Sequence, residues 1–317
     1  MLSVFFLAGM IGGIAGNVIS PGWVRTFAAW SGREGQAAVT AGLESLTWLL
    51  LPGLVLAVVL GAATLGTPHR HADAHERHNA LDKKEQRRRW WAFGVLYVGN
   101  AIRFPVNMAL IYLFVEWSTR LAGQRFPDAA DPGVVASSIN GPMQAAMQVG
   151  MGGGGILLGL LLRPRLEKPA FVLLPILGAI PIVVMPYADG LAGVWAYIAA
   201  FAAAVVAGVC FGGMFPVSLS LGQRLLPHRT ALASGMLLGG AWVWGWLGAR
   251  AAGVLDAGAR EGTLAGLLAS PFGLTGPEGA VGLGLERTFL VVAAVLAFSG
   301  LFMLVLPGRL LREIDPH

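Results

Sequence analysis

Residues 99–108 read GNAIRFPVNM, which places Arg103 inside a longer apolar stretch, residues 90–117. That stretch is long enough for one helical crossing of a bilayer, whose hydrocarbon core is about 30 Å thick. A charge at the bilayer centre is costly, so Arg103 should face the interior of a helix bundle or a water-filled cavity. Asn100 and Asn107 stand three residues before and four after it, and therefore project from the same helix face. The stretch predicts a polar stripe inside a bundle of membrane helices.

Two roles for this stripe stay open. Asn100, Arg103 and Asn107 can line a substrate path, with the guanidinium holding an anionic group. The alternative is a structural arginine that pairs with a carboxylate or with carbonyls at a helix end.

Composition supports the membrane assignment. The 317 residues are 56% hydrophobic and only 12% charged, with a mean hydropathy of +0.68, whereas soluble domains carry about 25% charged residues. We therefore expect an all-α, polytopic helical membrane protein. Its basic residues cluster in short loops between apolar spans, so the net charge of +5 does not indicate nucleic-acid binding. The single cysteine, Cys210, excludes a disulfide within the chain.

The apolar windows predict about eight transmembrane helices, and their ends predict an orientation. The expected spans are 2–20, 37–64, 90–117, 137–162, 169–187, 191–221, 230–254 and 288–307. With a cytoplasmic N-terminus, the inside connections hold fourteen Lys and Arg residues and the outside connections hold six. Because positive residues gather on the cytoplasmic side, we expect a multi-pass protein of the cytoplasmic (inner) membrane with both termini in the cytoplasm.

The chain divides into three parts by composition. Residues 1–65 form a two-helix N-terminal membrane segment, residues 66–89 a charged, His-rich cytoplasmic linker, and residues 90–317 a six-helix membrane bundle. If the linker is helical, one face carries three imidazoles and a carboxylate, which borderline metals accept; these are His71, His75, His78 and Asp82. The neighbouring KK and RRR runs favour a solvated linker, so no metal site is predicted.

A second polar stripe follows in the next span. Asn140, Gln144 and Gln148 recur at a spacing of four residues, next to a parallel row of methionines. Amides and flexible thioethers suit the wall of a substrate-binding cavity, although amides also hydrogen-bond between membrane helices. The glycine run at 150–155 indicates close approach of two helix backbones, since it is not a phosphate loop.

Three other residues are candidates for the transport chemistry. Glu44 lies inside its expected span, where a buried carboxyl could exchange protons and couple transport to a proton gradient; alternatively it extends to the interface or pairs with Arg103 or Arg250. Trp242 and Trp246 share a helix face and could stack on a substrate, or could anchor the helix at the membrane interface.

The later spans resemble the C-terminal six-helix half of a major facilitator superfamily transporter, most closely the fosmidomycin-resistance-like drug efflux branch. Three stretches carry the resemblance: NAIRFPVNMALIYLFVEW, GILLGLLLRPRLEKP and LSLGQRLLPHRTALASGMLLGGAWVWGWLG. The resemblance covers roughly residues 90–310. It implies that six of the helices form one half of a two-walled cavity. Only two spans precede the linker here, so a partner must supply the rest of the second wall, or the chain has kept the fold without transport.

These observations favour a secondary, ion-coupled transporter or transporter half-unit for a small anionic or amphipathic molecule, acting in efflux. The expected partners are membrane lipid, the small-molecule substrate, and either a second copy or an unrelated membrane protein. The alternative function is a non-transporting membrane subunit, derived from such a transporter, that docks onto a larger membrane complex. A metal sensor or exporter built on the His-rich linker is a third possibility. No GxSxG, HExxH or CxxC motif is present, so we expect neither an enzyme nor a cofactor.

Overall fold

The computed structural model of the chain describes residues 2–65, 82–129, 131–276 and 282–314. Nearly all regular structure in these residues is helical. Six helical segments of the described chain are long and apolar enough to cross a membrane: Ala37–Ala63, Lys83–Arg125, Pro132–Leu161, Arg165–Gly190, Trp195–Leu225 and Leu285–Val305. The predicted helical membrane-protein character is therefore confirmed.

The elements follow one another in a simple order along the chain. The N-terminal part consists of α1 (Leu2–Trp30), α2 (Gly35–Glu44), the 3-10 helix η1 (Ser45–Leu49) and α3 (Leu50–Leu65). The bundle then contains α5 (Lys83–Arg125), α6 (Pro132–Leu161), α7 (Pro164–Val184), η2 (Met185–Gly190), α8 (Trp195–Gly212), α9 (Met214–Leu225), η3 (Pro227–Arg229) and α10 (Thr230–Ala257). It ends with β1 (Ala259–Arg260), α11 (Leu264–Ala269), η4 (Ser270–Phe272), β2 (Thr275–Gly276), α12 (Leu285–Phe302), η5 (Met303–Val305) and α13 (Gly308–Glu313).

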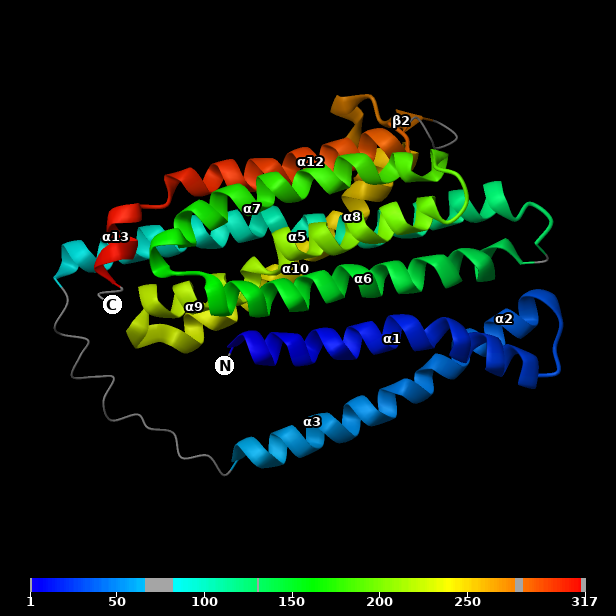
Figure 1. The fold of residues 1–317 in the computed structure, drawn as a ribbon, viewed down its shortest axis with the longest axis horizontal. Helices are drawn as coiled ribbons and strands as arrows, with labels where there is room; N and C mark the ends of the chain where they lie inside the picture. Colours follow the sequence, from blue (N-terminus) through cyan, green and yellow to red (C-terminus); the bar gives the residue numbers. More distant parts are fainter. Residues whose placement is uncertain (1, 66–81, 130, 277–281, 315–317) are drawn as a thin grey trace.

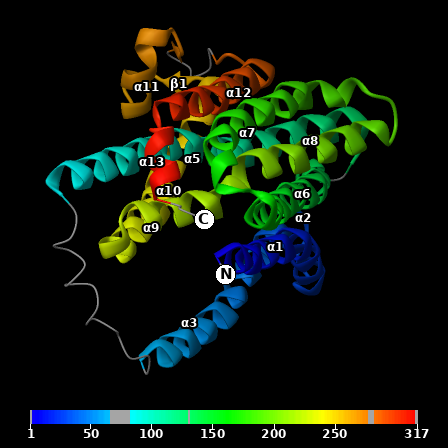
Figure 2. The same cartoon turned by 60° about the vertical axis from the view of Figure 1, so that its left-hand side comes forward.

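The long helix α5 lies at the centre of the bundle. It packs against α6, α10 and α12, while α6 also contacts α1 and α8, and α12 contacts α7 (Figures 1 and 2). The largest buried side chains come from these contacts and include Trp117, Phe114 and Phe289. A helix of 43 residues is about 65 Å long, roughly twice the thickness of the hydrocarbon core. At least one end of α5 must therefore project beyond a bilayer that surrounds the bundle.

The contact between α6 and α8 depends on glycine, as the sequence predicts. A Cβ atom added at Gly154 would lie 2.9 Å from the Cα of Val209, and one added at Gly208 would lie 3.0 Å from the backbone nitrogen of Met151. Side chains at these positions would force the two backbones apart. The start of α6 is defined by Pro132 at its first position and by Asp131, whose Oδ1 accepts a hydrogen bond of 3.2 Å from the Val134 N–H.

The N-terminal helices differ from the predicted pair of spans. α1 continues through Pro21 to Trp30, ten residues beyond the predicted end, and it packs on α6. The second predicted span is a continuous apolar segment but is interrupted by η1. Within its most apolar window no residue is buried, and in both views α3 diverges from the bundle (Figures 1 and 2). The N-terminal part thus contributes α1, which packs on α6 and carries α2 beside it, and α3, which diverges from the bundle.

One further boundary also differs from the sequence expectation. The sixth predicted span, 191–221, is two helices that meet at Gly213, where an added Cβ would lie 2.8 Å from the backbone of Gly154. At the other end of the bundle, Arg120 pairs with Asp189 at 3.1 Å and Glu286 at 3.2 Å and so joins α5, η2 and α12. The start of α1, the start of α5 and α13 lie toward the same end of the bundle in Figure 1.

Candidate functional site

Arg103 points into the bundle and is almost fully buried, with 3% of its surface exposed. Its Nη2 donates hydrogen bonds to the Asn100 side-chain oxygen and, over 3.2 Å, to the Ser218 hydroxyl on α9. The Ser218 hydroxyl in turn donates to the Met214 carbonyl at 2.7 Å. Both acceptors are neutral, and no ion pair to Arg103 is found among the described residues. A guanidinium has five N–H donors, so its positive charge is only partly compensated here.

A pocket of about 460 Å³ lies beside this guanidinium. Its wall is formed by α1, α5, α8, α9 and α10, with one residue each from α3 and α6. The lining residues are Phe6, Gly9, Met10, Leu56, Arg103, Phe104, Asn107, Met108, Met151, Phe211, Gly212, Phe215, Leu238, Ala241 and Trp242. Arg103 supplies the only charge in a lining that is otherwise apolar apart from Asn107. The volume lies within the range of small-molecule sites, about 300–1,000 Å³.

Aromatic rings form one side of the pocket. The Phe215 ring lies 5.3 Å from that of Phe6 and 5.2 Å from that of Phe104, the second pair edge to face. Such aromatic clusters give a rigid apolar surface at low conformational cost. A cation beside rigid aromatic rings suits a ligand with a negatively charged group and an apolar body.

The polar stripe of α5 divides between the pocket and its support. Asn107 lines the pocket with Arg103, and its side-chain oxygen is buried with no hydrogen-bond partner. Asn100 does not line the pocket; it orients the guanidinium, and its own side-chain nitrogen has no partner. Unpaired buried polar atoms are costly. The side-chain amide nitrogen of Asn100 and the side-chain oxygen of Asn107 therefore remain available for hydrogen bonds to a ligand or to water.

The amides of α6 lie elsewhere. Gln144 donates to the Ile111 carbonyl of α5 at 3.1 Å and to the Asn140 side-chain oxygen at 3.3 Å. Gln148 lies against Gly13 of α1, and its side-chain oxygen is buried without a partner. Gln144 and Gln148 therefore sit at helix–helix contacts, and none of the three amides is in the pocket lining, so the structure does not place them on one hollow with Arg103.

The two tryptophans of α10 have different surroundings. Trp242 lines the pocket, whereas the Trp246 ring lies outside the lining and stacks against the Arg250 guanidinium, 4.6 Å from the ring centre. Both indoles are largely exposed. Trp246 and Arg250 thus form a surface pair of the kind that anchors helices at a membrane interface.

Glu44 is the last residue of α2 and is exposed. Among the described residues, no ion pair joins it to Arg103 or Arg250, and it does not line the pocket. The imidazoles of the linker, His71, His75 and His78, lie outside the described residues. Within the described ranges no group of three or more His, Cys, Asp or Glu side chains could hold a metal ion.

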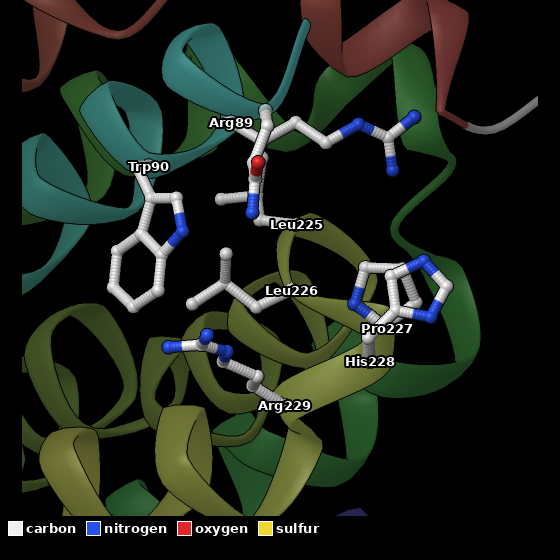
Figure 3. Close-up of a pocket in the computed structure, with 8 residues that line it drawn as sticks. Arg89, Trp90, Leu225, Leu226, Pro227, His228 and Arg229 are labelled. Carbon is white, nitrogen blue, oxygen red and sulfur yellow. The ribbon is translucent and has the colours of Figure 1, made fainter. Parts of the chain in front are cut away.

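A smaller hollow lies where the start of α5 meets η3. Figure 3 shows Arg89 and Trp90 of α5 on one side and His228 and Arg229 of η3 on the other. The Arg229 guanidinium lies over the Trp90 ring, 5.8 Å from its centre. The hollow holds about 30 Å³, room for a water molecule or so, and therefore cannot accept an organic ligand.

Sequence reasoning missed most of the pocket wall. Phe104, Phe211 and Phe215 were indistinguishable from lipid-facing residues, because apolar side chains cover both faces of a membrane helix. Ser218 carried a usable signal, since a hydroxyl in the apolar stretch PVSLS needs a partner. The chain matches no protein-family model, no curated protein sequence and no solved structure.

Proposed function

We propose that the chain is a secondary transporter, or a transporter half-unit, that moves a small amphipathic anion out of the cell. The proposal includes eight membrane crossings, cytoplasmic termini and the architecture of a major facilitator superfamily half. Its main support is the buried Arg103, which lines a 460 Å³ pocket and has only neutral hydrogen-bond partners among the described residues. A structural arginine would pair with a carboxylate or with carbonyls at a helix end, because an uncompensated buried charge is strongly destabilising.

The pocket lining supports the substrate class. One guanidinium faces a wall of aromatic, leucine and methionine side chains. A hydrophilic anion would make no apolar contact with that wall, and a neutral hydrocarbon would leave the charge of the guanidinium unpaired. A ligand with one acidic group on an aromatic or aliphatic body satisfies both.

The isolated helix α3 supports an incomplete second wall. Leu56 is its only residue in the pocket lining, and α3 makes its main contacts with the adjacent η1. A second copy of the chain, or a different membrane protein, would close the pocket on this side. Glu44, the exposed last residue of α2, which precedes η1 and α3, is the candidate proton carrier in the completed assembly.

Binding of 1-anilinonaphthalene-8-sulfonate to the full-length protein in nanodiscs tests the proposal. N-phenyl-1-naphthylamine, which has the same rings without the sulfonate, is the matched ligand. R103Q should weaken binding of the sulfonate by about 10- to 100-fold, the loss of one hydrogen bond to a charged group, and leave the neutral amine unaffected. R250Q is the matched control variant, since Arg250 lies outside the pocket lining.

The same two variants should also differ in transport when they are reconstituted into proteoliposomes with an imposed proton gradient. Flux of the sulfonate should collapse in R103Q and persist in R250Q, while both insert normally. Equal binding and flux in the two variants would remove Arg103 from the mechanism.

The second candidate is a non-transporting membrane subunit that docks onto a larger complex. The exposed surface of α3 favours it, because none of its most apolar window is buried within the chain. Purification in mild detergent discriminates the two functions: a stoichiometric unrelated partner supports the subunit, and a homodimer supports the transporter.

A further inference from the structure

A second hollow, about 470 Å³ in volume, lies between the start of α7 and α13. Three of its six lining residues are basic: Arg165 and Lys168 on α7 and Arg312 on α13. The remaining wall is small or apolar. Among the described residues no carboxylate lines it. This hollow is distant in sequence and composition from the Arg103 pocket, and it shares no residue with it.

The two described carboxylates that lie nearest in sequence to these basic residues pair elsewhere. Glu167, between the two basic residues of α7, pairs with Arg224 on α9. Glu313, next to Arg312, lies 3.5 Å from the Arg88 guanidinium of α5. The basic side chains therefore line one hollow without an ion-pair partner among the described residues, which is an arrangement that attracts an anion.

Lys168 is held in place for such a ligand. Its ammonium donates to the Leu304 carbonyl at 3.0 Å, which leaves two of its three N–H groups available. Gly308 makes room for its aliphatic stem, since an added Cβ there would lie only 3.2 Å from the Lys168 Cδ. The side chain thus crosses from α7 to the end of η5 and presents its charge to the hollow.

The position of the hollow indicates whether its anion is a membrane lipid or a soluble ion. One candidate membrane span begins at Arg165 and another ends at Val305. Leu166, Leu304 and Val305 are each more than half exposed, so an apolar surface directly adjoins the basic residues. The arginines of α13 are exposed beside this apolar surface, while its Leu310 and Leu311 are buried in the protein core.

We propose that this basic hollow binds the phosphate group of an anionic phospholipid. Basic pockets between membrane helices at the headgroup level have the chemistry for this recognition. The adjoining apolar surface accommodates the acyl chains, which a free phosphate ion would leave uncovered. Arg165, Lys168 and Arg312 are the residues that hold the phosphate.

Native mass spectrometry of the full-length protein in detergent tests the site, with dioleoylphosphatidylglycerol as the probe. The double variant R165Q/R312Q should bind the first lipid about 25-fold more weakly, since each basic residue near the surface contributes about a fivefold factor. R163Q/R309Q is the matched control: it removes the same charge from the same two segments, but Arg163 and Arg309 do not line the hollow. Its lipid affinity should stay near that of the unmodified chain.

Two further measurements test whether charge holds the lipid and whether the ligand is a lipid or a free phosphate. R165K/R312K keeps the charges and should keep the lipid; loss as complete as in the glutamine variant would refute a charge-based site. Equal weakening in both glutamine variants, or in neither, would also overturn the proposal. Excess inorganic phosphate should not displace the lipid, and displacement would show that the hollow takes a soluble phosphate instead.

Discussion

Replacement of Gly150 by alanine probes one of the close backbone contacts between α6 and α8. A Cβ at this position would meet the backbone of Val205 on α8, 2.9 Å from its carbonyl carbon and 3.1 Å from its Cα. Backbone atoms cannot rotate away as a side chain can, so α6 and α8 must separate by up to about 1 Å to restore ordinary contact distances. Such a gap removes a quarter to a half of the dispersion energy of the atom pairs that it affects.

The loss can be estimated from the packing. For about 40 affected atom pairs, each contributing about 0.15 kcal/mol, the separation costs about 1.5–3 kcal/mol of stability. Gly153→Ala is the control, because a Cβ there meets nothing within 4 Å; it should stabilise the helix by about 0.5–1 kcal/mol. The assay is unfolding of the purified protein in mixed micelles at increasing SDS fraction, followed by tryptophan fluorescence. If Gly150→Ala proves as stable as Gly153→Ala, the α6–α8 contact is not as close as described.

Three other changes test the pocket, a helix cap and the orientation. Asn100→Asp should place a carboxylate beside the buried guanidinium and weaken sulfonate binding at least tenfold while leaving the neutral amine bound, as measured by fluorescence titration; unaltered sulfonate binding would contradict an anion site. Asp131→Ala removes the side-chain cap of α6 and should lower stability by about 1 kcal/mol, read from the same SDS titration; no change would mean that the cap is dispensable. Cysteines introduced by Arg309→Cys and Glu261→Cys should react with an impermeant maleimide from opposite sides of a sealed vesicle, with buried Cys210 unreactive; labelling from one side would exclude the proposed topology.

Helix content and the inward direction of Arg103 could be predicted from the sequence. Long apolar windows fix where helices can form, because unsatisfied backbone groups are excluded from the bilayer. A buried charge also has only one favourable direction, toward the bundle. Those two constraints act within a single helix, so they do not require knowledge of its neighbours.

The neighbours of each helix could not be predicted in the same way. Gln144 and Gln148 share a stripe of α6, yet one bonds to α5 and the other lies against α1, because α6 has a different helix on each side. Trp246 and Arg250 face outward, although a similar pattern on α5 faces inward. Apolar residues face both lipid and protein, so hydrophobic periodicity does not identify the aromatic wall of the pocket.

The long helix α5 has a proline, Pro105, near its midpoint, and this is the point about which the helix can tilt. Pro105 removes one backbone hydrogen bond from the helix, and Gly248 of α10 packs directly against its carbonyl, so the pivot is held from outside. A tilt of about 10° about this point moves each tip of the rod by about 5 Å, in opposite directions. If α5 tilts in this way, the Glu85 end and the Arg120 end move in opposite directions, while Arg103, two residues from the pivot, moves very little.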